Sequence, residues 1–217
     1  MKKIIEKIEI AFRTAITNYM CTAYNPVWYK NSTLFKTSSF HKKFMVQIEA
    51  ICREQKEVFI RHFFENYTDQ YPPAWMITEC ISFGTTILIF RDLNSMHAKK
   101  AIAQDLGFHP TLIASWMESI GYTRNLCAHH LRIWNRWFVV KPQIPNKYST
   151  FTQISSRIAN KFYAQALIII LLLQNICPKY NWQAELFGLL QKYPAIPKQD
   201  VGFGEDWESD PLWQIHG

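Results

Sequence analysis

The run AQALIIILLLQNIC, residues 164–177, decides what kind of fold this chain adopts. Its unbroken apolar part extends only from Ala166 to Leu173. A helix needs about 20 apolar residues to cross a bilayer, so this run is too short to span one. We therefore expect a soluble protein with a buried core helix at about 154–176.

Apolar residues recur at helical spacing on both sides of this run. In the stretch 3–20, Glu9 lies four residues before Arg13, close enough to pair with it across one helical turn. Prolines suit a first turn and glycines suit a helix end, so a short helix ends at Gly107 and a long one begins at Pro110. The expected helices are 3–20, 39–66, one that begins in PPAWMITECISFGTTILIFRDL (72–93), 95–106, the long one from 110, 154–176 and 181–191.

Two segments do not fit the helical pattern. The stretch WFVVKPQIPNKYST, 137–150, combines β-forming residues with prolines and turn residues, which predicts a loop or short hairpin insertion. The segment 193–217 contains prolines, glycines and acidic residues, which predicts an extended tail that wraps the surface. We expect one all-α domain over 1–217, a helical bundle with this insertion and this tail.

The charge is unevenly distributed along the chain. The net charge is +7, yet five acidic residues and no Lys or Arg follow Lys198. Between Glu118 and Glu185 there is no Asp or Glu, while eight Lys or Arg occur. Two interpretations stay open: chance segregation of charge on a basic surface, or a positive field directed at a polyanion such as nucleic acid.

The cysteines and the N-terminus indicate the compartment. The chain has five cysteines, an odd number, and no Cys-x-x-Cys. This usage is typical of reduced thiols in the cytoplasm, and it favours neither a disulfide framework nor a zinc site. Glu6 and Glu9 interrupt the apolar residues of MKKIIEKIEI, so we expect no signal peptide.

The stretch YTRNLCAHHLRIWNRW, 122–137, holds three candidate catalytic residues: Arg124, Asn125 and His129. Together their side chains suit the cleavage of a phosphodiester. Imidazole has a reference pKa of about 6.5 and can give or take a proton. A guanidinium can grip a phosphate with two hydrogen bonds, and an amide can fix a hydroxyl or a histidine tautomer. Arg124 and His129 point about 140° apart on a regular helix. They converge only if Arg124 bends round, the helix is distorted, or a second copy of the chain completes the site.

Other residues are weaker candidates. His130, Arg132, Asn135 and Arg136 are possible RNA contacts, and Trp134 or Trp137 could stack on an unpaired base, although core packing suits both tryptophans. Glu79, as a buried acid, and Arg13 are possible orienting residues, although a structural salt bridge is the simpler role.

Two further patterns are set aside. The similar spacing of Arg91 and His97 in RDLNSMH spans a helix end and lies near acidic residues, so we treat it as a coincidence. Cys127 beside two histidines offers too few ligands for a metal site.

The segment RNLCAHHLRIWNR followed by KPQIP, with IEKIEIAFR, PPAWMITECISFG and GFGEDWESDPLW elsewhere, resembles the Abi family of phage abortive-infection proteins. The resemblance is to its AbiD/AbiF-like group, within the HEPN superfamily of helical proteins, and it runs from Ile4 to Trp213. It also implies that this chain starts at a helix that is interior in longer members.

The resemblance implies a fold, an activity and an assembly. The fold is a HEPN-like helical bundle. The activity is a metal-independent ribonuclease without a cofactor, in which Arg124, Asn125 and His129 match the Arg-polar-x(3–5)-His motif. In such nucleases the 2′-hydroxyl of RNA attacks the neighbouring phosphate. Two motifs commonly meet in a homodimer, and an RNA or protein antitoxin is a possible partner. Two alternatives stay open: a non-catalytic RNA-binding module, and a protein-interaction component of a defence complex.

Overall fold

A computed structural model describes residues 1–145, 158–204, 207–209 and 213. Every regular element in these residues is a helix, and the extended backbone there forms a single isolated bridge, between Phe35 and Leu93. The all-α prediction is confirmed. Among the helices described, none combines the length and the apolar character that crossing a membrane requires.

The chain divides into two compact units. The amino-terminal unit is Glu9–Pro110, and the carboxy-terminal unit joins Met1–Ile8 to Thr111–Gly217. Helix α1 supplies residues to both units. The expectation of one domain over the whole chain stays a prediction.

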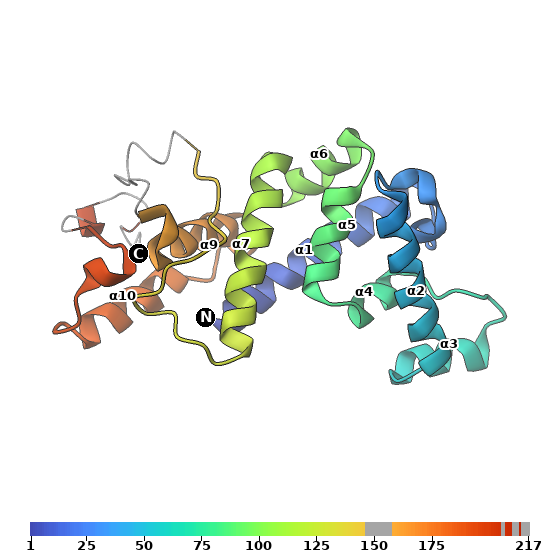
Figure 1. Ribbon diagram of the computed structural model, residues 1–217, viewed down its shortest axis with the longest axis horizontal. Coiled ribbons are helices and arrows are strands. Elements are labelled where there is room, and N and C mark those ends of the chain that lie inside the picture. Colours follow the sequence, from blue (N-terminus) through green and yellow to red (C-terminus); the bar gives the residue numbers. More distant parts are fainter. Residues whose placement is uncertain (146–157, 205–206, 210–212, 214–217) are drawn as a thin grey trace. The chain divides into compact units, whose positions relative to one another are not determined.

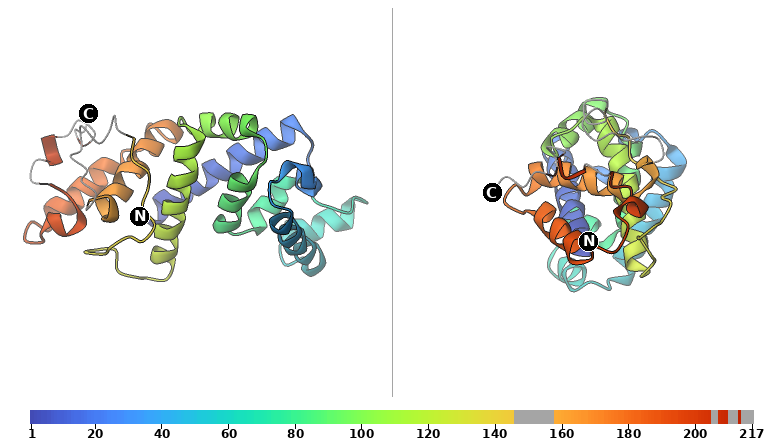
Figure 2. Two further views of the ribbon diagram at one scale, coloured as in Figure 1. Left: turned by 45° about the horizontal axis from the view of Figure 1, so that its top comes forward. Right: turned by 90° about the vertical axis from the view of Figure 1, so that its left-hand side faces the viewer.

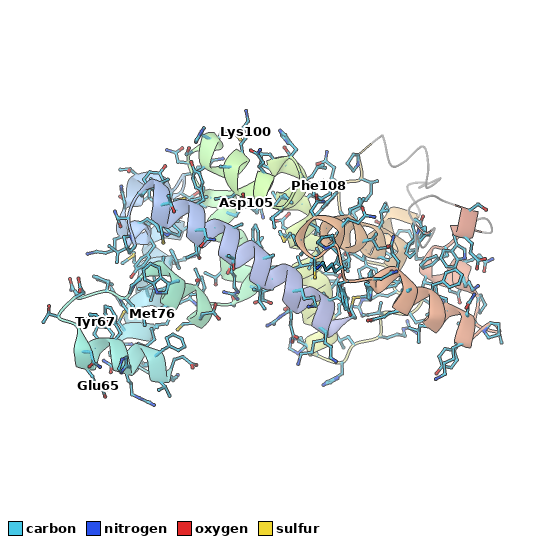
Figure 3. All side chains as sticks on the ribbon, turned by 180° about the vertical axis from the view of Figure 1, so that it is seen from behind. Glu65, Tyr67, Met76, Lys100, Asp105 and Phe108 are labelled. Atoms are coloured by element: carbon cyan, nitrogen blue, oxygen red, sulfur yellow. The ribbon has the colours of Figure 1, made fainter. Side chains whose placement is uncertain are left out.

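The amino-terminal unit consists of helices that are mostly short (Figure 1). Tyr67, just after α3, stacks on Phe63 with ring centroids 5.3 Å apart, and Lys100 and Asp105 mark α6 (Figure 3). Its elements are α1 (Lys2–Ala23) from Glu9 onward, two 3-10 turns (Trp28–Lys30 and Ser32–Leu34), α2 (Ser38–Glu54), α3 (Val58–Asn66), α4 (Ala74–Cys80), α5 (Phe83–Asp92) and α6 (Met96–Asp105).

Two predicted helices of this unit are each broken in two. The expected helix 39–66 ends at Glu54, because Gln55 adopts a left-handed backbone with φ 43°. The charged residues Lys56 and Glu57 separate it from the next helix. The helix expected from Pro72 stops at Cys80, and Ser82 caps a new one by accepting a hydrogen bond from the backbone N–H of Thr85. Side-chain caps and left-handed residues therefore override the apolar periodicity at both places.

The carboxy-terminal unit is built round the apolar run at 164–177. Its helices are α7 (Pro110–Ala128) from Thr111 onward, α9 (Phe162–Ile176) and α10 (Trp182–Lys192), with 3-10 turns at Ile158–Asn160, Lys198–Val201 and Trp207–Ser209. Every residue from Phe162 to Leu173 is buried, so the predicted core helix is confirmed, although residues 154–157 lie outside those described. Figure 2 follows this unit from α7 in yellow-green to α10 in orange.

A buried hydrogen-bond network joins α7 to α9. Gln165 donates from Nε2 to Ser119 Oγ over 2.7 Å, and its Oε1 accepts from Thr123 Oγ1 over 3.1 Å. All three side chains are fully buried. Ser119 Oγ also lies 3.0 Å from the carbonyl oxygen of Val140. Three polar groups in an apolar core thus satisfy one another only in one register of α7 against α9.

The segment 137–145, which follows the turn after α7, runs along that helix as irregular chain. Trp116 Nε1 donates to the carbonyl of Gln143 over 2.7 Å, and the N–H of Gln143 donates to Ser115 Oγ over 2.8 Å. Residues 137–145 contain no helix or strand, as expected for a loop, and 146–150 lie outside the described residues.

The C-terminal segment is anchored by aromatic side chains. Phe203, Trp207 and Trp213 are buried: Phe203 and Trp213 pack on Tyr163 of α9, and Trp207 packs on Phe203 and Trp213. Trp213 Nε1 also donates to the Tyr163 hydroxyl over 3.1 Å. The acidic composition of the tail gave no indication of this anchoring.

Replacing Gln165 with Leu should lower the free energy of unfolding by about 1–3 kcal/mol, because the Ser119 and Thr123 hydroxyls lose a buried partner. The matched control is Gln191→Leu on α10, where the side chain is exposed and the change should stay within about 0.5 kcal/mol. Urea unfolding monitored by circular dichroism measures both. Equal values for the two variants would contradict a structural role for the network.

Candidate functional site

The candidate catalytic segment lies where α7 ends. The N–H of His129 still donates to the carbonyl of Asn125 over 3.0 Å, so the helical pattern reaches the last motif residue. The next two N–H groups turn back: His130 bonds to Cys127 over 3.2 Å and Leu131 to Leu126 over 2.9 Å. His130 has φ 52°, in the left-handed region. This pairing is the Schellman ending of a helix, with a histidine where glycine is usual.

The three predicted catalytic residues are all on the surface. Arg124 and Asn125 are exposed in the last turn of α7, and His129 is exposed directly after it. None of them is buried against the core. Asn125 and His129 are one turn apart on the helix, whereas Arg124 and His129 leave it about 140° apart, because α7 stays helical through Ala128. Helix distortion therefore does not bring Arg124 and His129 together.

The turn after α7 is held by side chains of two helices. Arg136 Nη2 lies 3.4 Å from the Tyr122 hydroxyl of α7, and its Nη1 lies 3.3 Å from the carbonyl of Arg132. Asn135 has a left-handed backbone with φ 45°, and its Oδ1 accepts from Lys161 Nζ over 3.1 Å. Outside glycine, left-handed residues are uncommon and often mark functional segments.

The predicted RNA contacts differ in exposure. His130, Arg132 and Asn135 are exposed, whereas Arg136 is half-buried. The Nε of Arg136 is buried and has no hydrogen-bond partner among the described residues. Arg136 thus supports the turn, and its contact with RNA stays a prediction. Lys161, which joins Asn135, was not anticipated, because it is distant in sequence and lies at the start of α9.

The orienting role proposed for Glu79 and Arg13 requires correction. Glu79 is exposed in the last turn of α4, so the prediction of a buried acid is wrong. Arg13 is 9% exposed, and its guanidinium is occupied by Glu9 at 2.6 Å and by the carbonyls of Thr78 and Ile81. The predicted Glu9–Arg13 pair is confirmed. Arg13 therefore holds the backbone between α4 and α5.

Burial disfavours a reactive or metal-binding role for Cys127. Burial raises the pKa of the Cys127 thiol, which disfavours the thiolate that a nucleophile or metal ligand needs. Within the described part of the chain, no group of three His, Cys, Asp or Glu side chains could hold a metal ion.

The second pair with similar spacing, Arg91 and His97, lies on two different helices, α5 and α6. His97 Nδ1 is 2.9 Å from the Tyr19 hydroxyl.

An apolar cavity of about 420 Å³ lies in the same unit but does not include the motif. Ile133 and Trp134 reach into its lining from the turn after α7, and both are half-buried. Trp116 and Ile120, which flank the motif, are fully buried and cannot line an interface between chains. The rest of the lining comes from Met1, Phe162, Trp182, Glu185, Leu186, Leu189, Leu190, Tyr193, Ile196, Lys198 and Val201.

Substituting His130 with Gly should stabilise the fold by about 0.5–1 kcal/mol, because glycine adopts the left-handed backbone without a steric penalty. The same change at Ala128, two residues earlier, should cost about 1 kcal/mol, because that residue is helical. Thermal and urea unfolding of both variants test the helix ending. Destabilisation of similar size at the two positions would contradict it.

Comparison with known proteins places the chain in a family. A family model described as Abi-like protein matches residues 1–135. The match covers more than half of the chain and includes the whole Arg124–His129 segment. No curated protein and no solved structure matches the chain. The chain therefore belongs to the Abi-like protein family.

Proposed function

We propose that this chain is a metal-independent endoribonuclease of a phage-defence system, acting in abortive infection or as the toxin of a toxin–antitoxin pair. Membership in the Abi-like family supports the association with abortive infection. The observation that carries the nuclease assignment is the exposure of Arg124, Asn125 and His129 together at the end of α7. An all-α fold is consistent with placement in the HEPN superfamily.

The proposed reaction is an intramolecular transesterification of the RNA backbone. The 2′-oxygen forms a bond to phosphorus, and the bond from phosphorus to the 5′-oxygen breaks. His129 accepts the 2′-hydroxyl proton as a general base, and the departing 5′-oxygen takes a proton from water. Arg124 stabilises the charge that builds on the phosphate, and Asn125 orients the 2′-hydroxyl. The products are a 2′,3′-cyclic phosphate and a 5′-hydroxyl.

A homodimer would supply both groups to one phosphate. Arg124 and His129 diverge within one chain, and a two-fold axis near the end of α7 would place His129 of one copy opposite Arg124 of the other. Two apolar side chains in the segment that follows the motif are exposed, Leu131 at 48% and Val139 at 77%. Burying them between copies would offset the repulsion between two basic segments.

The surroundings favour binding of a polyanion. Residues 119–184 contain no acidic side chain, so the field near the motif is not neutralised by a carboxylate from that stretch. Positive charge of this kind raises the affinity for RNA through release of counterions, and the affinity should decrease as salt increases.

A second candidate function is a non-catalytic RNA-binding module that holds a structured RNA. The motif lies on open surface, and the described cavity does not include it. A surface without enclosure suits binding as well as catalysis, since it excludes little water from the reacting groups. Cleavage assays separate the two functions.

Arg124→Ala and His129→Ala should each reduce RNA cleavage by about 10²–10⁴, because a charge-stabilising group or a general base is removed. The assay uses total RNA and tRNA in EDTA, with end-group analysis of the products. The matched controls are Arg91→Ala and His97→Ala, which have similar spacing but lie on separate helices, and they should leave the rate unchanged.

Two results would refute the nuclease assignment. One is cleavage that requires Mg²⁺, and the other is cleavage that survives both Arg124→Ala and His129→Ala. RNA binding without any cleavage by the wild-type chain would support the binding module instead.

A further inference from the structure

The two tryptophans in the turn after α7 have different surroundings. Trp134 is half-buried and lines the apolar cavity. Trp137 is 55% exposed, although it is large and apolar. Both tryptophans were predicted as possible stacking residues. In the structure, only Trp137 has its ring exposed on the surface.

The backbone on both sides of Trp137 is fixed. Before it, the Arg136 guanidinium lies 3.4 Å from the Tyr122 hydroxyl. After it, Phe138 is fully buried, its ring 6.2 Å from that of Tyr122, and its N–H donates to the carbonyl of Asn160 over 2.7 Å. The ring between these two anchored neighbours is 55% exposed, so the turn presents it to solvent. Trp137 is therefore a platform held between two residues that contact Tyr122, and Tyr122 shares a face of α7 with Asn125 and His129, three and seven residues later.

The ammonium group of Lys161 lies over the Trp137 ring. Lys161 Nζ lies 6.0 Å from the centre of the Trp137 ring and 3.1 Å from Asn135 Oδ1. The hydrogen bond keeps the ammonium over one face of the ring, and Asn135 is itself in a left-handed conformation. An exposed aromatic face with an adjacent positive charge is the combination that proteins use to hold single-stranded nucleic acid, because the ring stacks on a base and the cation attracts a phosphate.

We propose that Trp137 and Lys161 form a subsite that stacks an unpaired RNA base and holds the phosphate next to it. This inference rests on the proposed function and names its substrate class: single-stranded RNA, or an unpaired loop, in preference to a duplex. The bases of a duplex are already stacked on one another and cannot reach the Trp137 ring. The subsite would direct unpaired segments toward the motif at the end of α7.

The test measures binding to a short single-stranded 2′-O-methyl oligoribonucleotide of mixed sequence, and to its duplex. The 2′-O-methyl group removes the attacking hydroxyl, so no cleavage interferes. Trp137→Ala should weaken single-strand binding by roughly 10- to 100-fold, whereas Trp137→Phe should retain most of it. Lys161→Gln should reduce the slope of log affinity against log salt by about one. The matched control is Trp75→Ala on α4, where the side chain is 50% exposed, and binding there should not change.

Each outcome decides the inference. A loss specific to Trp137→Ala, with a preference for single strand over duplex, supports it. Unchanged affinity in Trp137→Ala, equal loss in Trp75→Ala, equal binding to duplex, or no binding to RNA overturns it. The nuclease assignment fails separately: a chain that binds single strands through Trp137 but cleaves no RNA keeps the subsite and loses the activity.

Discussion

The hydrogen bonds among Ser119, Thr123 and Gln165 are the constraint on which the carboxy-terminal unit depends. They lie in an apolar core, where a hydroxyl or amide without a partner is costly, so they allow one register of α7 against α9. The same Ser119 binds the carbonyl of Val140, which fixes the chain that returns along α7. The end of α7 and the turn after it are therefore both positioned from the core.

The proposed chemistry lies at the boundary of this rigid framework. Asn125 and His129 are joined by the last regular hydrogen bond of α7, and His130 reverses the chain in a left-handed conformation. The turn then presents Trp137 on the surface and buries Phe138. Groups at a helix end combine a fixed backbone with open access, which suits a substrate as large as RNA. Arg124 and His129 diverge on the helix, and the proposed dimer brings one of each to a single phosphate.

The sequence predicted the elements that depend on long apolar patterns and on proline or glycine. The buried helix α9, the start of α7 at Pro110 and the turn at Gly107 all follow from such signals. The breaks at Gln55 and Ser82 could not be predicted, because a left-handed residue and a serine cap interrupt continuous periodicity. Contacts between residues that are distant in sequence could not be predicted either. Examples are Lys161 over the Trp137 ring, and Arg13, which binds the carbonyls of Thr78 and Ile81 and not Glu79.

The central claim is that one chain contributes Arg124 and another contributes His129. Its most direct test is complementation between Arg124→Ala and His129→Ala chains that carry different tags, co-expressed and purified through both tags in succession. The mixed dimers retain one Arg124 and one His129 facing the axis, so they should cleave RNA in EDTA although neither variant does so alone. Inactive mixed dimers, shown by native mass spectrometry to contain both chains, or a wild-type chain that is fully active as a monomer, would contradict the account.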